Sequence, residues 1–281
     1  MLNSYFFIPA NNKKFIDKAG ELDAHAIVFD LEDAIGPSEI EDSMENLRGI
    51  TLRENHYVRL SFFANENYEL NEKIFSKLLA MGFRGFVIPK FRSEKQVHVL
   101  NSFLKHSGLA KHEVRFILLV EHPAGLFELI PVLKDGLINF VGVALGSHDY
   151  ADALGMKHTL QNLYFGRQFV LNLAKAFDID AIDIVSLETT DYSLFNNECL
   201  DGFQMGFDGK FLIHPGQLKS MNSLRYYSHD EVEEALAVQA HLDDIRTGRS
   251  PVIRINGKAY ERPHVNRLEK IIKWSKYNAG K

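Results

Sequence analysis

The stretch Phe116-Ile117-Leu118-Leu119-Val120-Glu121-His122 decides the fold class, because five apolar residues in a row are followed by two polar ones. A nearly continuous apolar run is typical of a strand covered on both faces, as in a parallel sheet. Seven further runs resemble it, and stretches with helical spacing lie between most of them. The seven runs are Tyr5–Ile8, Ala26–Phe29, Tyr57–Leu60, Gly85–Ile88, Phe140–Leu145, Ala181–Val185 and Phe211–Ile213.

Eight strands that alternate with helices predict an α/β fold of the (β/α)8 TIM-barrel type, which we assign to residues 1–224. An open, doubly wound sheet is the alternative architecture for the same pattern. Beyond the eighth run the pattern changes. Ser228 and Glu231 form a capping-box pair at a helix start, Asn256-Gly257 indicates a hairpin, and a last helix begins near Pro263. We therefore predict a helical and hairpin extension over residues 225–281, either a lid or an arm that packs on a neighbouring subunit.

Composition narrows the class of protein. Of 281 residues, 46% are hydrophobic and 25% are charged, as in globular domains. Lys and Arg total 32 against 37 Asp and Glu, and this net charge of -5 disfavours a nucleic-acid binder. The single cysteine, Cys199, excludes an internal disulfide and suits a reducing compartment. No apolar stretch reaches the roughly 18 residues of a membrane span, and no secretory signal is recognisable. We expect a cytoplasmic protein without membrane or nucleic-acid partners.

Polar side chains follow most of the apolar runs. In barrel enzymes the active site lies at the carboxyl ends of the strands, so these residues are expected to converge there. Polar residues also mark loops in any α/β protein, which explains part of the pattern. The candidates are Asp30, Glu32 and Asp33 after the second run, Arg59 within the third, Lys90 after the fourth, Glu121 after the fifth, Asp149 after the sixth, and His214 and Pro215 after the eighth.

Glu121 and Asp149 end consecutive runs, and adjacent strands lie about 4.8 Å apart. Their carboxylates could share one ion, and two carboxylates with water and substrate oxygens are a usual Mg²⁺ environment. The alternative is a pair of loop carboxylates, one of which caps a helix. Arg59 is the natural partner for a substrate carboxylate, because a guanidinium grips a carboxylate in a fork. A structural ion pair of Arg59 with the acidic residues of the second strand end is equally compatible with the sequence.

Lys90 offers a different chemistry. A lysine at a barrel strand end can form a Schiff base with a carbonyl substrate, and otherwise it attracts anions or pairs with Glu121. The 12 histidines show no metal-ligand spacing such as HExxH, and no phosphate-binding glycine motif occurs. Cys199 has no evident base partner and is expected to pack passively.

A set of short motifs, in this order and spacing, resembles the citrate lyase beta subunit family within the HpcH/HpaI aldolase superfamily. The motifs cover most of the chain: Phe7–Asn11, Phe29–Ala34, Val58–Leu60, Ile88–Lys90, Val120-Glu121, Gly146–Gly155, Gly206–Lys210 and Ile213–Pro215.

The resemblance implies a barrel, often a homotrimer, that cleaves or forms a carbon–carbon bond in a citryl, malyl or citramalyl thioester. Glu121 and Asp149 match the Mg²⁺ ligands and Arg59 the anchor of the substrate carboxylate. Asp30, Glu32 and Asp33 match an acidic motif that supports this arginine. Lys90, His214 and Pro215 are further candidates for substrate binding.

The resemblance also implies that an acid from the neighbouring subunit's lid reaches the site, and Glu261 occupies that position. Related malyl thioester enzymes have an aspartate there. His122 and His148 also depart from the family pattern, which bears on the identity of the substrate. The partners that the resemblance implies are an oxoacid and an acyl thioester of CoA or an acyl carrier. An aldolase that acts on free 2-keto acids, a thioester hydrolase and a non-catalytic paralogue are the alternatives.

Overall fold

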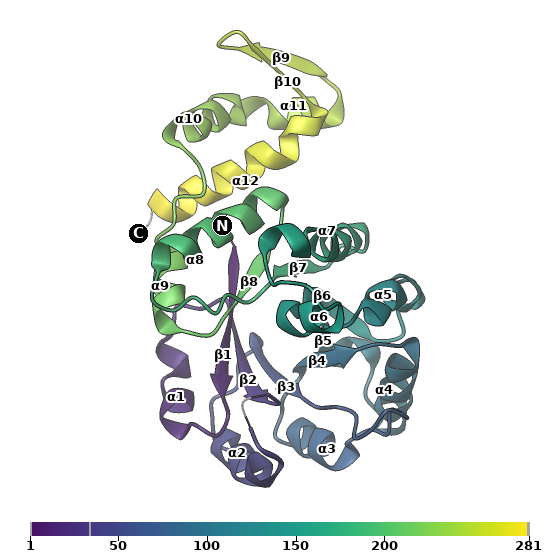
Figure 1. Ribbon diagram of the computed structural model, residues 1–281. Helices are drawn as coiled ribbons and strands as arrows, with labels where there is room; N and C mark the ends of the chain where they lie inside the picture. Colours follow the sequence, from purple (N-terminus) through teal and green to yellow (C-terminus); the bar gives the residue numbers. More distant parts are fainter. Residues whose placement is uncertain (1, 34, 280–281) are drawn as a thin grey trace. The chain divides into compact units, whose positions relative to one another are not determined.

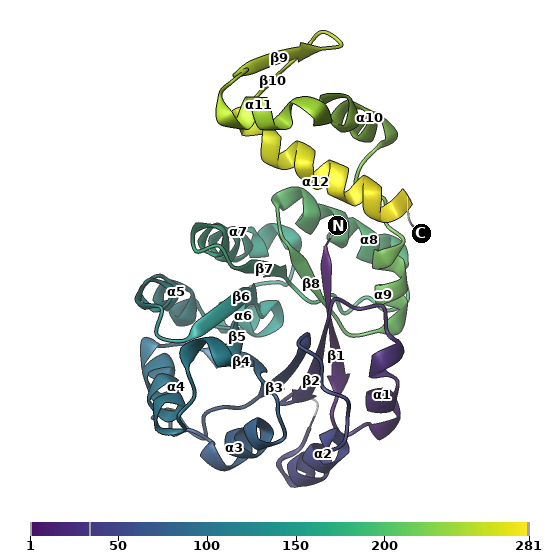
Figure 2. The same cartoon turned by 180° about the vertical axis from the view of Figure 1, so that it is seen from behind.

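Eight parallel strands close into a barrel in sequence order, in a computed structural model that describes residues 2–33 and 35–279 (Figures 1 and 2). The (β/α)8 prediction is confirmed, and the open doubly wound alternative is wrong because β1 pairs with β8. The strands are β1 (Asn3–Pro9), β2 (Ala26–Leu31), β3 (His56–Leu60), β4 (Gly85–Phe91), β5 (Arg115–Val120), β6 (Asn139–Leu145), β7 (Asp180–Asp183) and β8 (Gly209–Leu212).

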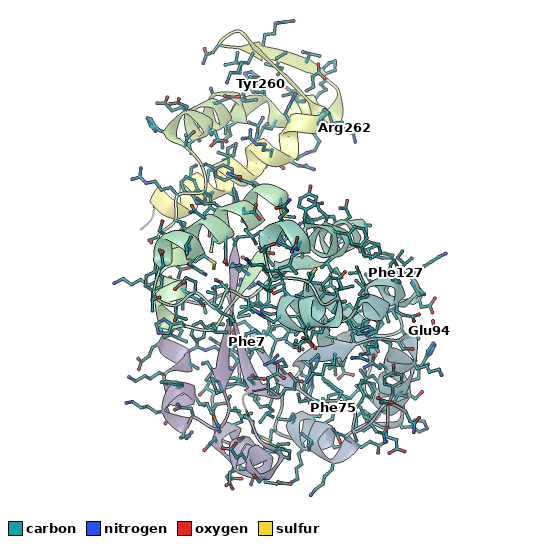
Figure 3. The ribbon with its side chains drawn as sticks, viewed as in Figure 1. Phe7, Phe75, Glu94, Phe127, Tyr260 and Arg262 are labelled. Carbon is teal, nitrogen blue, oxygen red and sulfur yellow. The ribbon has the colours of Figure 1, made fainter. Side chains whose placement is uncertain are left out.

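Helices surround the strands on the outside of the barrel (Figure 1). Phe75 of α3, labelled in Figure 3, is fully buried and packs edge-on against Phe86 of β4, with ring centroids 4.9 Å apart. The helices of this unit are α1 (Lys13–Asp17), α2 (Ile40–Leu47), α3 (Glu72–Ala80), α4 (Glu94–His106), α5 (Pro123–Asp135), α6 (Ser147–Ala153), α7 (Leu160–Ala176), α8 (Tyr192–Met205) and α9 (Pro215–Asn222).

One apolar cluster draws a residue or two from each of the eight strands, among them Tyr5, Val28, Tyr57, Ile117 and Phe211. Alternate residues of a strand face opposite sides of the sheet, so one set can fill the barrel while the other packs on the helices. The interior of the barrel is therefore a packed core, and a ligand site is expected beyond the strand ends.

A buried ion network ties α7 to β7 and β8. Arg167 is 1% exposed and donates through Nε and Nη2 to the two Asp183 oxygens, each at 2.9 Å. Lys210, also buried, donates from Nζ to the backbone oxygen of Ile184 at 2.8 Å. Gly202 is required beside this network, because a Cβ there would lie 2.3 Å from Asp183 Oδ2. Satisfied buried charges of this kind hold neighbouring elements in one arrangement.

The described part of the chain from Leu224 onward forms a second compact unit with its own apolar core, to which Ala235, Tyr260 and Leu268 belong. Its elements are α10 (His229–Val238), α11 (Leu242–Thr247), β9 (Val252–Ile255), β10 (Lys258–Glu261) and α12 (Arg262–Ala279), and Figure 3 labels Tyr260 and Arg262.

The capping box and the hairpin turn that the sequence predicts for this unit are both present. Ser228 Oγ accepts the Glu231 N–H at 3.2 Å, and Glu231 Oε2 accepts the Ser228 N–H at 2.9 Å, so the predicted capping box is present. Asn256 and Gly257 have φ of 50° and 78° and join β9 to β10 as the predicted hairpin turn. No helix within residues 2–33 and 35–279 is both long enough and apolar enough to cross a membrane.

Candidate active site

A cavity of about 280 Å³ lies at the carboxyl ends of the barrel strands. Five charged side chains line it: Asp30, Asp33, Arg59, Glu121 and Asp149. An apolar wall surrounds them, formed by Phe7, Pro9, Leu119, Leu145, Val185, Leu187, Phe211 and Ile213. The strand ends thus bring together the two predicted metal ligands, the predicted anchor and part of the acidic motif.

Arg59 is oriented by the acidic residues at the end of β2. Asp30 and Arg59 are register partners across β2 and β3, so their side chains start from adjacent positions. Arg59 Nε donates to Asp30 Oδ1 at 2.8 Å, and Nη2 donates to Oδ2 at 2.6 Å. Nη1 lies 3.0 Å from Asp33 Oδ2 and 3.2 Å from Glu32 Oε2. The fork of the guanidinium therefore holds Asp30, which is the ion pair that sequence alone left as an alternative.

This arrangement still leaves Arg59 two donors. A guanidinium has five N–H groups, and its hydrogen bonds to Asp30 and Asp33 use three of them. Nη1 also forms an ion pair with Glu32 Oε2. Burial alone would lower the pKa of Arg59, but the hydrogen bonds and charge of Asp30 raise it above its usual range. Arg59 is thus a fixed cation at the cavity wall. We expect any anchoring of a substrate to use the N–H groups that Asp30 and Asp33 leave free, together with the charge of Arg59.

Lys90 links the acidic motif to Glu121. Its backbone is left-handed, with a φ of 52°, and its N–H donates to Glu121 Oε2 at 2.6 Å. Its Nζ lies 2.5 Å from Glu32 Oε1 and 3.4 Å from Asp33 Oδ1. Although burial alone would lower it, the hydrogen bond and charge of Glu32 raise the pKa of Lys90 to about 12. A Schiff base needs a neutral amine, so this environment disfavours that chemistry.

Glu121 is a buried carboxyl group in an acidic setting. It is 5% exposed, and burial, followed by the charge of Glu32, raises its pKa to about 8. The charge of Asp149 adds to this rise, which agrees with the position of both residues at one cavity. Asp149 is exposed and lies in the first turn of α6, the helix that directly follows β6.

Gly146 makes room for the Glu121 side chain. Val120 and Leu145 pair across β5 and β6, so Gly146 lies beside Glu121 at the strand ends. A Cβ at position 146 would lie 2.2 Å from Glu121 Cγ, which is closer than atoms approach in real structures.

We expect Gly146→Ala to displace the Glu121 carboxylate and to destabilise the protein by about 1–3 kcal/mol, the usual cost of overpacking. Urea unfolding and magnesium titration by calorimetry measure the two effects. Gly20→Ala is the matched control, because its Cβ would meet only Arg53 Nη2 at an ordinary 3.4 Å. Equal magnesium affinity in Gly146→Ala and the parent would contradict this prediction.

A family model described as HpcH/HpaI aldolase/citrate lyase matches residues 3–215. The chain belongs to the HpcH/HpaI aldolase/citrate lyase family. The prediction of a lyase similar to the citrate lyase beta subunit is confirmed at the level of the family.

Two curated relatives match over nearly the whole chain. The citrate lyase subunit beta of Leuconostoc mesenteroides subsp. cremoris is 28% identical over 284 residues, which cover 97% of this chain and 92% of that protein. A (3S)-malyl-CoA thioesterase of Cereibacter sphaeroides is 26% identical over 270 residues, which cover 93% and 90%. Among solved structures, CitE from Mycobacterium tuberculosis in complex with magnesium, acetoacetate and coenzyme A matches 97% of both chains. Its TM-score is 0.78 at 21% identity, and this match supports the fold.

Other predicted site residues of this HpcH/HpaI family member lie elsewhere. His214 is the N-cap of α9, where its Nδ1 accepts the Gly216 N–H at 3.1 Å. His214 and Pro215 do not line the cavity, whereas the preceding Ile213 does. Lys90 lines a neighbouring pocket, and Glu32 is buried behind Arg59. Glu261 lies at the end of β10 in the second unit and is exposed.

Sequence reasoning missed a pair of stacked histidines at the cavity. The rings of His148 and His158 are parallel to within 2°, with centroids 4.0 Å apart. His158 Nε2 lies 2.9 Å from Ser147 Oγ, and His148 lines the cavity. His148 Nε2 is buried and has no hydrogen-bond partner in the part of the chain that the structure describes, so a bound molecule could satisfy it. The pairing joins α6 to the loop after it, and no local pattern signals it.

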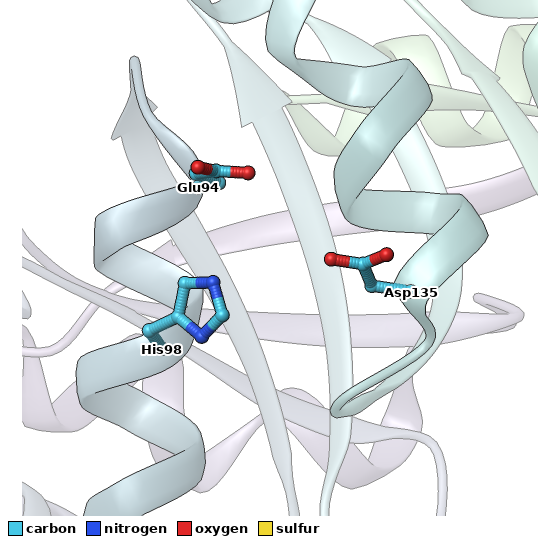
Figure 4. Close-up of side chains that lie close together, drawn as sticks. All are labelled: Glu94, His98 and Asp135. Carbon is cyan, nitrogen blue, oxygen red and sulfur yellow. The ribbon is translucent and has the colours of Figure 1, made fainter.

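A separate group of ligand-type side chains lies on the outer helices. Glu94 and His98 of α4 and Asp135 of α5 bring one ligand atom each within 4.8 Å of one another (Figure 4). All three are exposed, and exposed acidic groups commonly lie this close without an ion. None of the three lines the cavity of this HpcH/HpaI family member.

Proposed function

We propose that this chain cleaves, or in the reverse direction forms, the carbon–carbon bond of a 3-hydroxyacyl thioester of the citryl, malyl or citramalyl type, with an oxoacid as one product. The observation that carries the proposal is the convergence of Glu121, Asp149 and Arg59 on one small cavity at the strand ends. A volume of about 280 Å³ is near the lower end of ligand pockets, which suits a short oxoacid. The thioester and its carrier would extend beyond this cavity.

The residues present fit a divalent cation. Asp30, Glu32, Asp33, Glu121 and Asp149 supply five carboxyl groups, against the two cations of Arg59 and Lys90. We propose Glu121 and Asp149 as the ligands of Mg²⁺, which prefers carboxylate oxygens and keeps several waters. When bound, Mg²⁺ would supply Lewis-acid stabilisation of the oxoacid oxygens.

The chain's own groups would do the rest. Arg59 would orient the substrate carboxylate, because Asp30 fixes the guanidinium before substrate arrives. Asp33 and Glu32 hold the same group from the other side. The apolar wall, which includes Phe7, Leu119 and Phe211, would exclude bulk water from the reacting carbons.

Cleavage needs two proton movements. The 3-hydroxyl group gives its proton to a water molecule and becomes the keto group, the carbon–carbon bond breaks, and the electron pair of that bond passes to the thioester enolate. That enolate then takes up a proton at its α-carbon. We propose Glu261 of a neighbouring copy, or a water held by the acidic motif, as the donor of this proton.

We expect Glu261→Gln to lower turnover while magnesium binding stays unchanged, because the amide keeps the shape but has no proton to transfer. Steady-state kinetics and magnesium titration by calorimetry give the two measurements. Glu233→Gln, an exposed glutamate of the same unit, is the matched control. Turnover equal to that of the parent would remove Glu261 from the mechanism.

Magnesium affinity should depend on pH. A raised pKa means that the neutral form of the Glu121 carboxyl group is favoured, and a metal must displace its proton. Because this pKa is about 8, affinity should fall about tenfold for each pH unit below 8 and level off above it. Calorimetric titration with magnesium chloride at pH 6.5, 7.5 and 8.5 checks this. Equal affinity at all three pH values would contradict it.

The assay that tests the function offers malyl-CoA, citramalyl-CoA and citryl-CoA to the purified protein, with magnesium or with EDTA. Formation of an oxoacid and a shorter thioester that EDTA stops would support the proposal. Release of free CoA and a hydroxy acid would instead identify a thioester hydrolase, the second candidate, which the thioesterase relative favours. Turnover of free 2-keto acids alone would identify a CoA-independent aldolase. No turnover in any arm would favour a non-catalytic paralogue.

We also propose a homotrimer that works in the cytoplasm. Exposed aromatic side chains on outer helices support self-association. Phe127 of α5, labelled in Figure 3, is 62% exposed, and Phe165 of α7 is 60% exposed. Sedimentation equilibrium tests the assembly, since a trimer has three times the chain mass of 32.1 kDa. The single cysteine agrees with a reducing compartment.

A further inference from the structure

A second cavity, of about 350 Å³, lies at the opposite ends of the strands from the candidate active site. Its walls come from the loops that lead into β3, β4 and β5, so it opens on the amino-terminal face of the barrel. Three arginines line it: Arg53 from the first loop, Arg84 from the second, and Arg115 at the start of β5. This face is not used by the chemistry of barrel enzymes, so a concentration of arginines there needs a separate explanation.

The three guanidinium groups have no carboxylate partner among the described residues. Arg84 Nη1 donates only to backbone oxygens, of Leu79 at 2.9 Å and Phe83 at 2.8 Å. Arg115 Nη2 donates to the backbone oxygen of Glu54, and its guanidinium lies 5.7 Å from the centre of the Tyr57 ring. The Arg53 guanidinium makes neither a hydrogen bond nor an ion pair with any described residue. Most of the N–H donors of three cations therefore remain available.

Two acidic residues, Glu54 and Glu113, also line the cavity, and neither carboxylate forms an ion pair with an arginine of the described chain. Glu113 Oε2 accepts the N–H of Ala110 at 2.5 Å, so this carboxylate stabilises the turn before β5. Glu54 is exposed, and its carboxylate has no ion-pair partner in the described chain. Three cations against two anions leave a positive cavity.

His56 adds an independent sign of a ligand. Its residue is 6% exposed, it lines the same cavity, and its Nδ1 is buried without a hydrogen-bond partner among residues 2–33 and 35–279. The ring is held edge-on against Phe29, with centroids 5.4 Å apart. Burial, and then the charge of Arg53, lower the pKa of the His56 imidazole, which favours a neutral ring with one N–H to donate. A buried polar atom left without a partner is unfavourable unless a ligand or water satisfies it.

We propose that this cavity binds a small oxyanion with two or more negative charges, of the phosphate or polycarboxylate kind. Guanidinium groups match the geometry of both anions and are weakly hydrated for cations, so several around one cavity favour a multiply charged ligand over a monovalent one. The site is distinct from the proposed lyase site, and the inference does not rest on the proposed function.

Calorimetric titration of the full chain in magnesium-free buffer tests the proposal, with inorganic phosphate, pyrophosphate and citrate as separate probes. The expected result is saturable binding to the parent protein. Affinity should fall about tenfold or more in Arg53→Gln and in Arg84→Gln, because each variant loses one charge-assisted hydrogen bond to the anion. Arg53 is exposed and unbonded, so its replacement should leave the fold intact. The preferred probe distinguishes a phosphate from a polycarboxylate ligand.

Two controls make the result decisive. Arg48→Gln removes the same charge from the end of α2 without touching the cavity, and it should keep the affinity of the parent. Arg59→Lys reports binding at the other cavity. The proposal is overturned if no probe binds saturably, if Arg53→Gln and Arg84→Gln bind as well as Arg48→Gln, or if only Arg59→Lys weakens binding.

Discussion

Arg59→Lys should lower kcat/KM by about 10²–10³, the loss seen when one preorganised donor is removed from an active site. A lysine keeps the charge but cannot donate to both oxygens of Asp30 and still reach Asp33, as the guanidinium does here. The two N–H groups that Asp30 and Asp33 leave free, which we assign to the substrate carboxylate, would also be lost. Steady-state kinetics with the best substrate of the thioester panel measure this effect.

Arg48→Lys serves as the control for Arg59→Lys, because Arg48 is exposed and pairs only with Glu45. Thermal unfolding should show that Arg59→Lys remains folded. A more severe variant, Arg59→Ala, should also be inactive. Parental activity in purified and folded Arg59→Ala would remove Arg59 as the anchor of the substrate.

Glu121→Gln should lower magnesium-dependent turnover by about 10²-fold or more, because a neutral amide is a poor ligand for a hard cation. The substitution keeps the shape of the side chain, and the amide oxygen can still accept the Lys90 N–H. The backbone around Lys90 should therefore stay in place. Magnesium titration and kinetics at pH 8.5 together measure the loss.

Although Glu121→Gln should lower turnover, it should not lower the stability of the metal-free protein. Burial raises the pKa of Glu121 to about 8, so ionisation of this group weakens the metal-free fold as the pH rises through 8. The neutral glutamine avoids this penalty, and its Tm in EDTA at pH 9 should be equal to or above that of the parent. Glu45→Gln, on the surface, is the control. A strong loss of Tm would show that Glu121 holds the fold and would make its loss of activity uninformative.

The barrel could be predicted because each strand is defined by a local apolar run. Phe116–Val120 and Phe140–Leu145 agree with β5 and β6 to within one residue. The last two strands were placed too late along the chain: β7 ends at Asp183 and β8 begins at Gly209. Asp183 is buried because Arg167 neutralises it, and a short sequence pattern cannot show a partner on another helix.

The candidate site could be predicted in its charged residues but not in their partners. Position at a strand end follows from the sequence, and Glu121, Asp149 and Arg59 line one cavity, while their roles in binding stay predictions. Which acidic residues accept the hydrogen bonds of Arg59 depends on the register between β2 and β3. The stacking of His148 on His158 depends on the path of the loop after α6. His214 is outside the cavity lining and caps α9, because a polar residue after a strand also suits the cap of the next helix, and its role in substrate binding stays a prediction.

Lys90 contacts Glu121 through its backbone N–H and Glu32 through its ammonium group. These two contacts constrain the residue type at position 90 in different ways during evolution. A glycine or asparagine, which tolerate a left-handed backbone, would preserve the amide contact while discarding the cation. The residue type at position 90 can therefore change during evolution while Glu121, which we propose as a magnesium ligand, keeps its backbone hydrogen bond. We expect selection against a β-branched residue such as valine at position 90, because a branched side chain disfavours a left-handed backbone.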